Sequence, residues 1–174
     1  MQREMIIVPY DKTWKEKFES AKQNLFNIFG NLVIDIEHFG STSIVGMSAK
    51  PIIDIMVFVS DINEVDNYND RMKSLGYVPK GENGMKGRRY FQKFDDDGVN
   101  HVEHIHCYEK NNIHALEELM FRDFLKINQK AFDNYKAIKY EASKKYRYSP
   151  SEYTNYKTEC INKIMKEAKL YYTK

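Results

Sequence analysis

The sequence predicts an α/β (α+β) fold, in which a mixed β-sheet is flanked by helices and followed by a C-terminal helical section. Strand-like and helix-like stretches alternate over residues 1–109. Within them, residues 51–59 (PIIDIMVFV) are apolar enough for a strand buried on both faces. From Ile113 onward, apolar residues recur at helical spacing. We therefore expect an α/β core at 1–109 and helices at 110–174 packed on it, as one compact domain.

In the first half of the chain, the first helix is expected to be capped by Asp11 or Thr13 and to end at Gly30. Its apolar residues fall on one stripe, as in a helix that packs on a sheet. The other elements expected in this half are a strand at 32–39, a Gly/Ser/Thr-rich connection at 40–50, the buried strand at 51–59 and a helix at 61–75.

In the second half, a glycine-rich loop at 80–87 separates a short strand from a predicted hairpin. The strands expected here are 77–79, 88–94 and 102–108. Helices follow from Ile113 and over 132–145, and a last helix is expected to be capped by Ser149 or Ser151, with Pro150 in its first turn.

The composition fits one globular domain and excludes several classes. The chain has 174 residues, of which 42% are hydrophobic, and this suffices for a core. A net charge of +2 gives no overall attraction to nucleic acid. Residues 110–174 hold 14 Lys/Arg against 8 Asp/Glu, which indicates either a solvated helix face or a basic patch for a phosphate-bearing ligand.

Cysteines and apolar runs restrict the cellular context. Cys107 and Cys160 lie far apart and indicate neither a disulfide framework nor a zinc knuckle. The first residues (MQREMIIVPYDKTW) have too short an apolar run for a signal peptide, and no run reaches membrane-spanning length. We expect a soluble, cytoplasmic protein with no membrane partner.

Asp54 is the one charge within the buried strand. An unpaired carboxylate there is costly, so it needs a metal, a cation or several N–H donors. One interpretation is structural, with Asp54 capping the preceding loop or paired with Lys50. The other is functional, because residues 40–43 (Gly-Ser-Thr-Ser) lie just upstream and allow an anion to approach the backbone. A phosphate beside a carboxylate usually implies a bridging divalent cation.

A second polar stretch is HVEHIHCY, in which His104 and His106 share one face of a strand. His-x-His on a strand is a frequent metal-ligand arrangement, and imidazole suits Zn or Mn better than Mg. The alternative is a polar strand face that bonds to loops. Glu37 and His38 end the first strand beside the Gly-Ser turn, where His38 either orients a phosphate or stabilises the turn.

The stretch HFGSTSIVGMSAKPIIDIMV resembles the signature of the GrpB family, which has a nucleotidyltransferase-like fold. The resemblance continues through HVEHIHCY, FRDFL (121–125) and the Tyr/Lys residues of the last helices, so it spans nearly the whole chain. It implies a Gly-Ser turn that holds phosphates and a following strand that supplies acidic metal ligands. Some family members occur fused to dephospho-CoA kinase, which fits a role linked to CoA metabolism.

The resemblance assigns expected roles residue by residue. Asp54 and Arg122 would be catalytic. The metal ligands would be Asp54, His104, His106 and Glu37, with Mg, Mn or Zn as the cofactor. The phosphate-binding residues would be Gly40, Ser41, Thr42, Lys50, Lys139 and Lys157. For Lys139 and Lys157 the alternative is that they lie over aromatic rings without binding a ligand.

One position departs from the pattern of nucleotidyltransferase-like folds, which usually carry two carboxylates as D-x-D on this strand. The second place holds Met56, whose thioether cannot replace a hard oxygen ligand for Mg²⁺. Two functions therefore stay open, namely a metal-dependent nucleotidyltransferase acting on a small molecule and a non-catalytic module that binds a nucleotide or phosphorylated small molecule. Nucleic-acid binding is disfavoured, because no recognised motif accompanies the basic helices.

Overall fold

The computed structural model describes residues 4–173 and contains one mixed sheet of five strands. In chain order the strands are β1 (Val33–Phe39), β2 (Ile53–Val59), β3 (Tyr77–Pro79), β4 (Arg89–Phe94) and β5 (His101–Glu109). In space their order is β1-β2-β5-β4-β3. The β2–β5 pair is parallel and the other neighbouring pairs are antiparallel. The predicted mixed sheet flanked by helices is confirmed. Residues 1–3 and 174, which fall within the expected domain limits, lie outside this description.

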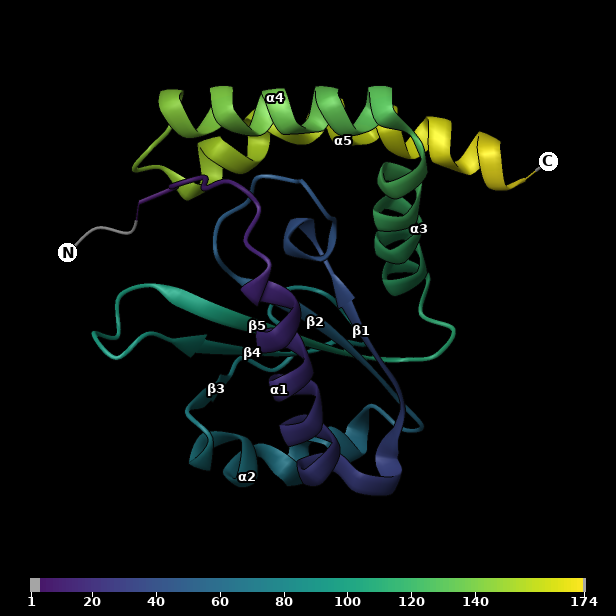
Figure 1. Ribbon diagram of the computed structural model, residues 1–174. Helices are drawn as coiled ribbons and strands as arrows, with labels where there is room; N and C mark the ends of the chain where they lie inside the picture. The colour runs from purple at the N-terminus through teal and green to yellow at the C-terminus, as the bar shows by residue number, and fades with distance from the viewer. Residues whose placement is uncertain (1–3, 174) are drawn as a thin grey trace.

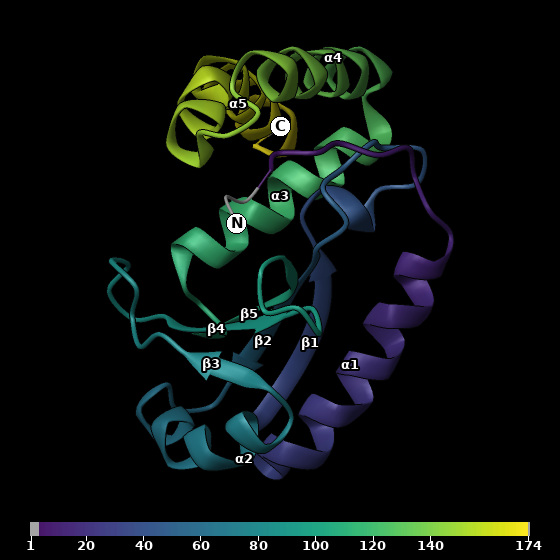
Figure 2. The same ribbon diagram turned by 90° about the vertical axis from the view of Figure 1, so that its left-hand side faces the viewer.

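Helix α1 (Thr13–Phe29) covers one face of the sheet (Figure 2). Its buried side chains form one stripe, as the spacing predicts, and pack against the alternate residues of β2 that point toward them. The residues at the centre of this cluster are Trp14, Leu25, Ile53, Ile55, Val57 and Ile105. This main core holds β2 and β5 together and thereby fixes the positions of the side chains on the opposite face of these strands.

Helix α3 (Ile113–Ile127) packs on the other face, where Phe39, Met56, Phe58, Tyr108 and Ala115 form a smaller cluster. Helices α4 (Gln129–Lys145) and α5 (Pro150–Tyr172) lie side by side at one end of the molecule, far from α2 (Asn69–Ser74) (Figure 1). They pack on α3 and on the connection between β1 and β2 through a third cluster. No helix within 4–173 combines the length and the apolar character needed to cross a bilayer.

The single helix expected at 61–75 is wrong. The segment is a 3₁₀ stretch, Asn63–Tyr68, followed by the six-residue α2. The Asp61 carboxylate accepts a bond from the backbone N–H of Asn63 at 2.8 Å. Asp and Asn side chains compete with helical bonds in this way, and the segment is rich in both.

Candidate functional site

The parallel pairing of β2 with β5 brings the acidic and histidine residues together. It places Asp54 opposite His104 and Met56 opposite His106, so the two histidines and Asp54 share the face that points away from α1. His104 Nδ1 lies 3.1 Å from Asp54 Oδ1. One ligand atom from each of Asp54, His104 and His106 lies within 4.8 Å of the others. The expected approach of the His-x-His pair to Asp54 is therefore present.

His106 carries a buried ring nitrogen with no partner. Within the described chain, its Nε2 atom has no hydrogen-bond partner, while the edges of Phe39 and Tyr90 enclose the ring at centroid distances of 5.0 Å and 4.8 Å. Burial lowers the pKa of His106 to about 3, against the opposing effect of Asp54. The imidazole is thus neutral and keeps a lone pair. Buried polar atoms without a partner are rare, and this one suits a metal ligand.

Asp54 is ionised in this setting. Burial by itself would raise the pKa of Asp54, but the hydrogen bond from His104 and the positive charge of Lys50 hold the pKa below its usual range. Its side chain remains 27% exposed, toward the cavity described below. The site thus combines one carboxylate with two imidazoles, a donor set that fits Zn²⁺ or Mn²⁺ better than Mg²⁺.

His104 lies in the middle of a hydrogen-bonded chain. Because a carboxylate only accepts, His104 Nδ1 carries the proton that it donates to Asp54. Its Nε2 atom lies 2.7 Å from His101 Nδ1, within hydrogen-bond distance. A metal bound at His104 Nδ1 would require this proton to leave, and His101 would then accept from Nε2–H. Such a bond to the second ring nitrogen is the usual support of a metal-ligating histidine.

Gly40 lets the chain pass directly over Asp54. It adopts φ 68° and ψ −175°, a region that residues with a Cβ rarely enter. A Cβ atom at this position would lie 2.6 Å from Asp54 Oδ2. The short 3₁₀ turn Ser41–Ser43 follows immediately. The predicted Gly-Ser turn therefore begins where the backbone touches the Asp54 carboxylate, and only glycine leaves room for that approach.

Thr42 and His38 form the inner support of this turn. Thr42 Oγ1 donates to the Ile52 carbonyl at 3.1 Å and lies 3.0 Å from His38 Nε2, from which it accepts. The His38 ring stacks on Phe18 of α1 at 4.7 Å. Burial lowers the pKa of His38 to about 4, so the ring is neutral. Of the two interpretations offered for His38, these contacts favour the one in which it stabilises the turn.

Three lysines face the acidic group across a cavity of about 250 Å³. The Lys139 side chain is buried, donates to the Ser48 carbonyl and lies 5.2 Å above the ring of Tyr135. Lys157 and Lys50 lie over Tyr153, at 4.2 Å and 5.1 Å from the ring centroid. The lysines do cover aromatic rings, as one interpretation predicted, and they also line the cavity.

The lysines share this space at an electrostatic cost. Burial and then repulsion from Lys157 and Lys50 lower the pKa of Lys139 well below its usual value. Burial and repulsion from Lys50 lower the pKa of Lys157 to about 8. An anion placed between the three ammonium groups would relieve this repulsion, so the cavity is built to receive negative charge.

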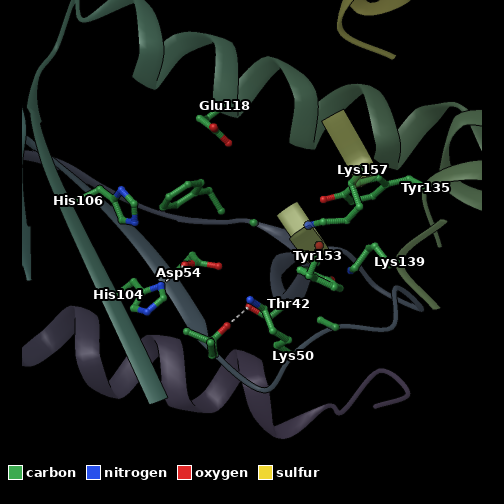
Figure 3. Close-up of a pocket in the computed structure, with 15 residues that line it drawn as sticks. Thr42, Lys50, Asp54, His104, His106, Glu118, Tyr135, Lys139, Tyr153 and Lys157 are labelled. Carbon is green, nitrogen blue, oxygen red and sulfur yellow. Dashed lines mark hydrogen bonds and ion pairs between the residues drawn. The ribbon is translucent and has the colours of Figure 1, made fainter. Parts of the chain in front are cut away.

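Figure 3 shows Asp54, His104 and His106 on one side of the cavity and the lysines on the other. The wall also includes three residues that sequence reasoning did not assign to the site, namely Glu118, Tyr135 and Tyr153. Burial raises the pKa of Glu118, with repulsion from Asp54 and Glu117 adding to the effect. Tyr135 precedes Lys139 on α4 and Tyr153 precedes Lys157 on α5, each by four residues, so helical spacing was the signal that could have placed these rings beside the lysines.

Arg122 and Glu37 bond to each other instead of lining this cavity. Arg122 Nη1 donates to Glu37 at 2.7 Å and to the His38 carbonyl at 2.9 Å. Its Nε donates to Asp123 at 2.7 Å. Neither residue belongs to the cavity wall, and Glu37 is not among the grouped metal-competent side chains of the described residues. These positions do not support the expected roles in catalysis and metal binding, because each charge is already compensated.

Comparison with known proteins agrees with the pattern of motifs. The GrpB protein family model matches residues 4–167. The UPF0157 protein YqkA of Bacillus subtilis is 39% identical over 97% of this chain, which spans about half (48%) of YqkA. The glutamate-rich protein GrpB of Alkalihalophilus pseudofirmus is 34% identical over 94% of this chain and 95% of its own length.

Among solved structures, the conserved protein GrpB from Enterococcus faecalis superposes with a TM-score of 0.90 and 34% identity, over 97% of this chain and all (100%) of that one. The Cid1 poly(U) polymerase aligns far less closely, with a TM-score of 0.47 and 12% identity over 76% of this chain and 45% of that one. The sequence, the motifs and the near-complete structural match agree, and the chain belongs to the GrpB family.

Proposed function

We propose that the protein is a metal-dependent nucleotidyltransferase, which transfers a nucleotidyl group from a nucleoside triphosphate to a small molecule. One observation carries the proposal: Asp54 and two imidazoles, one with an unpartnered buried nitrogen, face three lysines across one small cavity. A metal-bound polyphosphate satisfies both sides at once. Its oxygens would coordinate the cation on one side and accept hydrogen bonds from the lysine ammonium groups on the other.

In this proposal the protein binds and orients the phosphates. Lys139 and Lys157 hold negative charge that grows on the leaving pyrophosphate, and the close backbone approach at Gly40 places the α-phosphate against Asp54. The hydroxyl oxygen of the acceptor forms a bond to the α-phosphorus while the bond to the β-phosphate oxygen breaks; pyrophosphate leaves with that electron pair, and the hydroxyl proton passes to water. A divalent cation bound by Asp54, His104 and His106 would lower the charge of the phosphates.

Calorimetry with nucleotides and metals tests the proposal. ATP, GTP, CTP, UTP and CoA precursors are titrated with Mg²⁺, Mn²⁺ or Zn²⁺ into the wild type, Asp54→Asn and His106→Ala. We expect metal-dependent nucleotide binding that both variants weaken by tenfold or more. Asp35→Asn, at an exposed acid on β1, is the control and should bind like the wild type. Absence of nucleotide binding with every metal contradicts the proposal.

A second function is favoured by the environment of Met56. This side chain is fully buried in the cluster between β2 and α3, so the second position of the D-x-D pattern supplies no carboxylate. A cavity with a single acid at the metal is compatible with binding a nucleotide or phosphorylated small molecule without transfer. Metal-dependent binding together with no pyrophosphate release over hours would support this binding module in place of the enzyme.

A further inference from the structure

The lysine-lined cavity continues into a second one. Four residues line both cavities, namely Phe39, His106, Glu118 and Tyr135. The second cavity is the larger, at about 400 Å³ against about 250 Å³. A ligand whose charged end lies beside Asp54 therefore has room to extend past His106 between the sheet, α3 and α5.

The two cavities differ in chemical character. The first is bordered by ammonium groups, whereas the second is bordered mainly by rings and flexible apolar side chains. Besides the shared residues, its wall includes Tyr108, Phe121, Ile161 and Met165. Such a lining suits a planar ring, because aromatic faces and methionine sulfur make favourable contacts with π-systems.

Arg88 adds a fixed polar group to the second cavity. It is buried, and its Nε and Nη2 atoms donate to the backbone carbonyls of Glu82 and Asn83 at 2.9–3.3 Å. Its guanidinium lies 4.9 Å from the ring centroid of Tyr90. No carboxylate in the described part of the chain lies within ion-pair distance of it, and its charge acts on Glu118 and Tyr108, which line the same cavity. A buried cation of this kind favours a ligand that carries carbonyl or ring-nitrogen acceptors.

We infer that the second cavity binds the nucleobase, a planar heteroaromatic ring with acceptor groups, of the ligand whose phosphates lie in the first cavity. The inference rests on the proposed function and deepens it, because it assigns binding of the nucleobase to Phe121, Met165, Arg88 and their neighbours. The phosphates and the base are then bound in different cavities, so the two contributions to affinity can be measured separately.

The test compares inorganic triphosphate with UTP and ATP by calorimetry in the presence of Mn²⁺. In the wild type, the nucleotides should bind at least tenfold more tightly than inorganic triphosphate. Phe121→Leu should remove about 5- to 30-fold of the nucleotide affinity, the usual worth of one stacked base, and change inorganic triphosphate by less than twofold. Met165→Trp, which fills the cavity, should have the same selective effect.

Phe132→Leu is the matched control. Phe121 and Phe132 are both partly buried and pack on the same helical cluster, but Phe132 borders neither cavity. It should leave both affinities unchanged, and equal melting temperatures of the three variants would exclude an effect of unfolding.

Two results overturn the inference while leaving the proposed function intact. One is a wild type that binds inorganic triphosphate as tightly as nucleotides. The other is nucleotide binding that survives both Phe121→Leu and Met165→Trp. A wild type that binds neither probe with any metal contradicts the proposed function itself.

Discussion

Gly40→Ala should damage the site through a single methyl group. Two costs follow from the geometry. The backbone conformation at Gly40, φ 68° and ψ −175°, costs a residue with a Cβ about 1–3 kcal/mol. The new Cβ would also lie 2.6 Å from Asp54 Oδ2, and relieving such an overlap costs about 1–3 kcal/mol more. We expect about 2–6 kcal/mol of lost stability.

Gly98→Ala provides a control for a Cβ added at a positive φ without a steric contact. Gly98 has φ 69°, nearly the same as Gly40, but a Cβ there has no atom within 4 Å. It should cost only about 1–2 kcal/mol. Urea unfolding monitored by the fluorescence of the buried Trp14 measures both variants.

The affinity for a metal ion distinguishes the overlap of the new Cβ with Asp54 from the backbone strain. Relief of the overlap moves the Asp54 carboxylate, so Gly40→Ala should weaken Mn²⁺ or Zn²⁺ binding at least tenfold, whereas Gly98→Ala should not change it. If Gly40→Ala unfolds at the same urea concentration as Gly98→Ala and binds metal normally, the argument that Gly40 is required by Asp54 is refuted.

Three further changes probe the surroundings of the site. The affinity for inorganic triphosphate should fall as the pH rises through about 8. Burial lowers the pKa of Lys157 to about 8, so its side chain is charged below that pH and neutral above it. In Lys157→Arg, titrated between pH 6.5 and 9, the fall in affinity should be smaller. Arg122→Ala should lower the free energy of unfolding by about 1–3 kcal/mol, since it leaves Glu37 without its ion-pair partner and Asp123 with Lys126 alone, and should change triphosphate affinity less than twofold; a loss of affinity without a loss of stability would place Arg122 back in the site. Thr42→Val should cost about 1–3 kcal/mol in urea unfolding, because a backbone carbonyl and an imidazole both lose their partner, whereas Thr158→Val on exposed α5 should cost less than about 0.5 kcal/mol.

The residues of the sheet were the most accessible to sequence reasoning. A charge inside an apolar strand needs a partner, and a two-residue repeat puts His104 and His106 on one face. These two local rules nominated three side chains that the structure brings within 4.8 Å of one another. Strand alternation is a property of consecutive residues, so it can be read without knowledge of the tertiary fold.

The helical side of the cavity could not be predicted in the same way. Tyr153 lies four residues before Lys157 on α5, so that contact follows from helical spacing, whereas its contact with Lys50 depends on how α5 packs on the connection between β1 and β2. For Arg122 a motif suggested a role at the ligand, and the fold adds Glu37 of β1 as a partner beside the neighbouring Asp123. Ion pairs between distant segments are not encoded in spacing.

The parallel pairing of β2 with β5 has a consequence for the order of events in folding. Asp54 and His104 are separated by 50 residues, which include α2, β3 and β4. Closing a loop of that length is slow compared with forming the β4–β5 hairpin, so their contact belongs to a late step. In a refolding experiment with metal present, the capacity to bind the ion should appear with the slowest phase. A chelating indicator that follows the free metal concentration would then measure the formation of the native β2–β5 pairing.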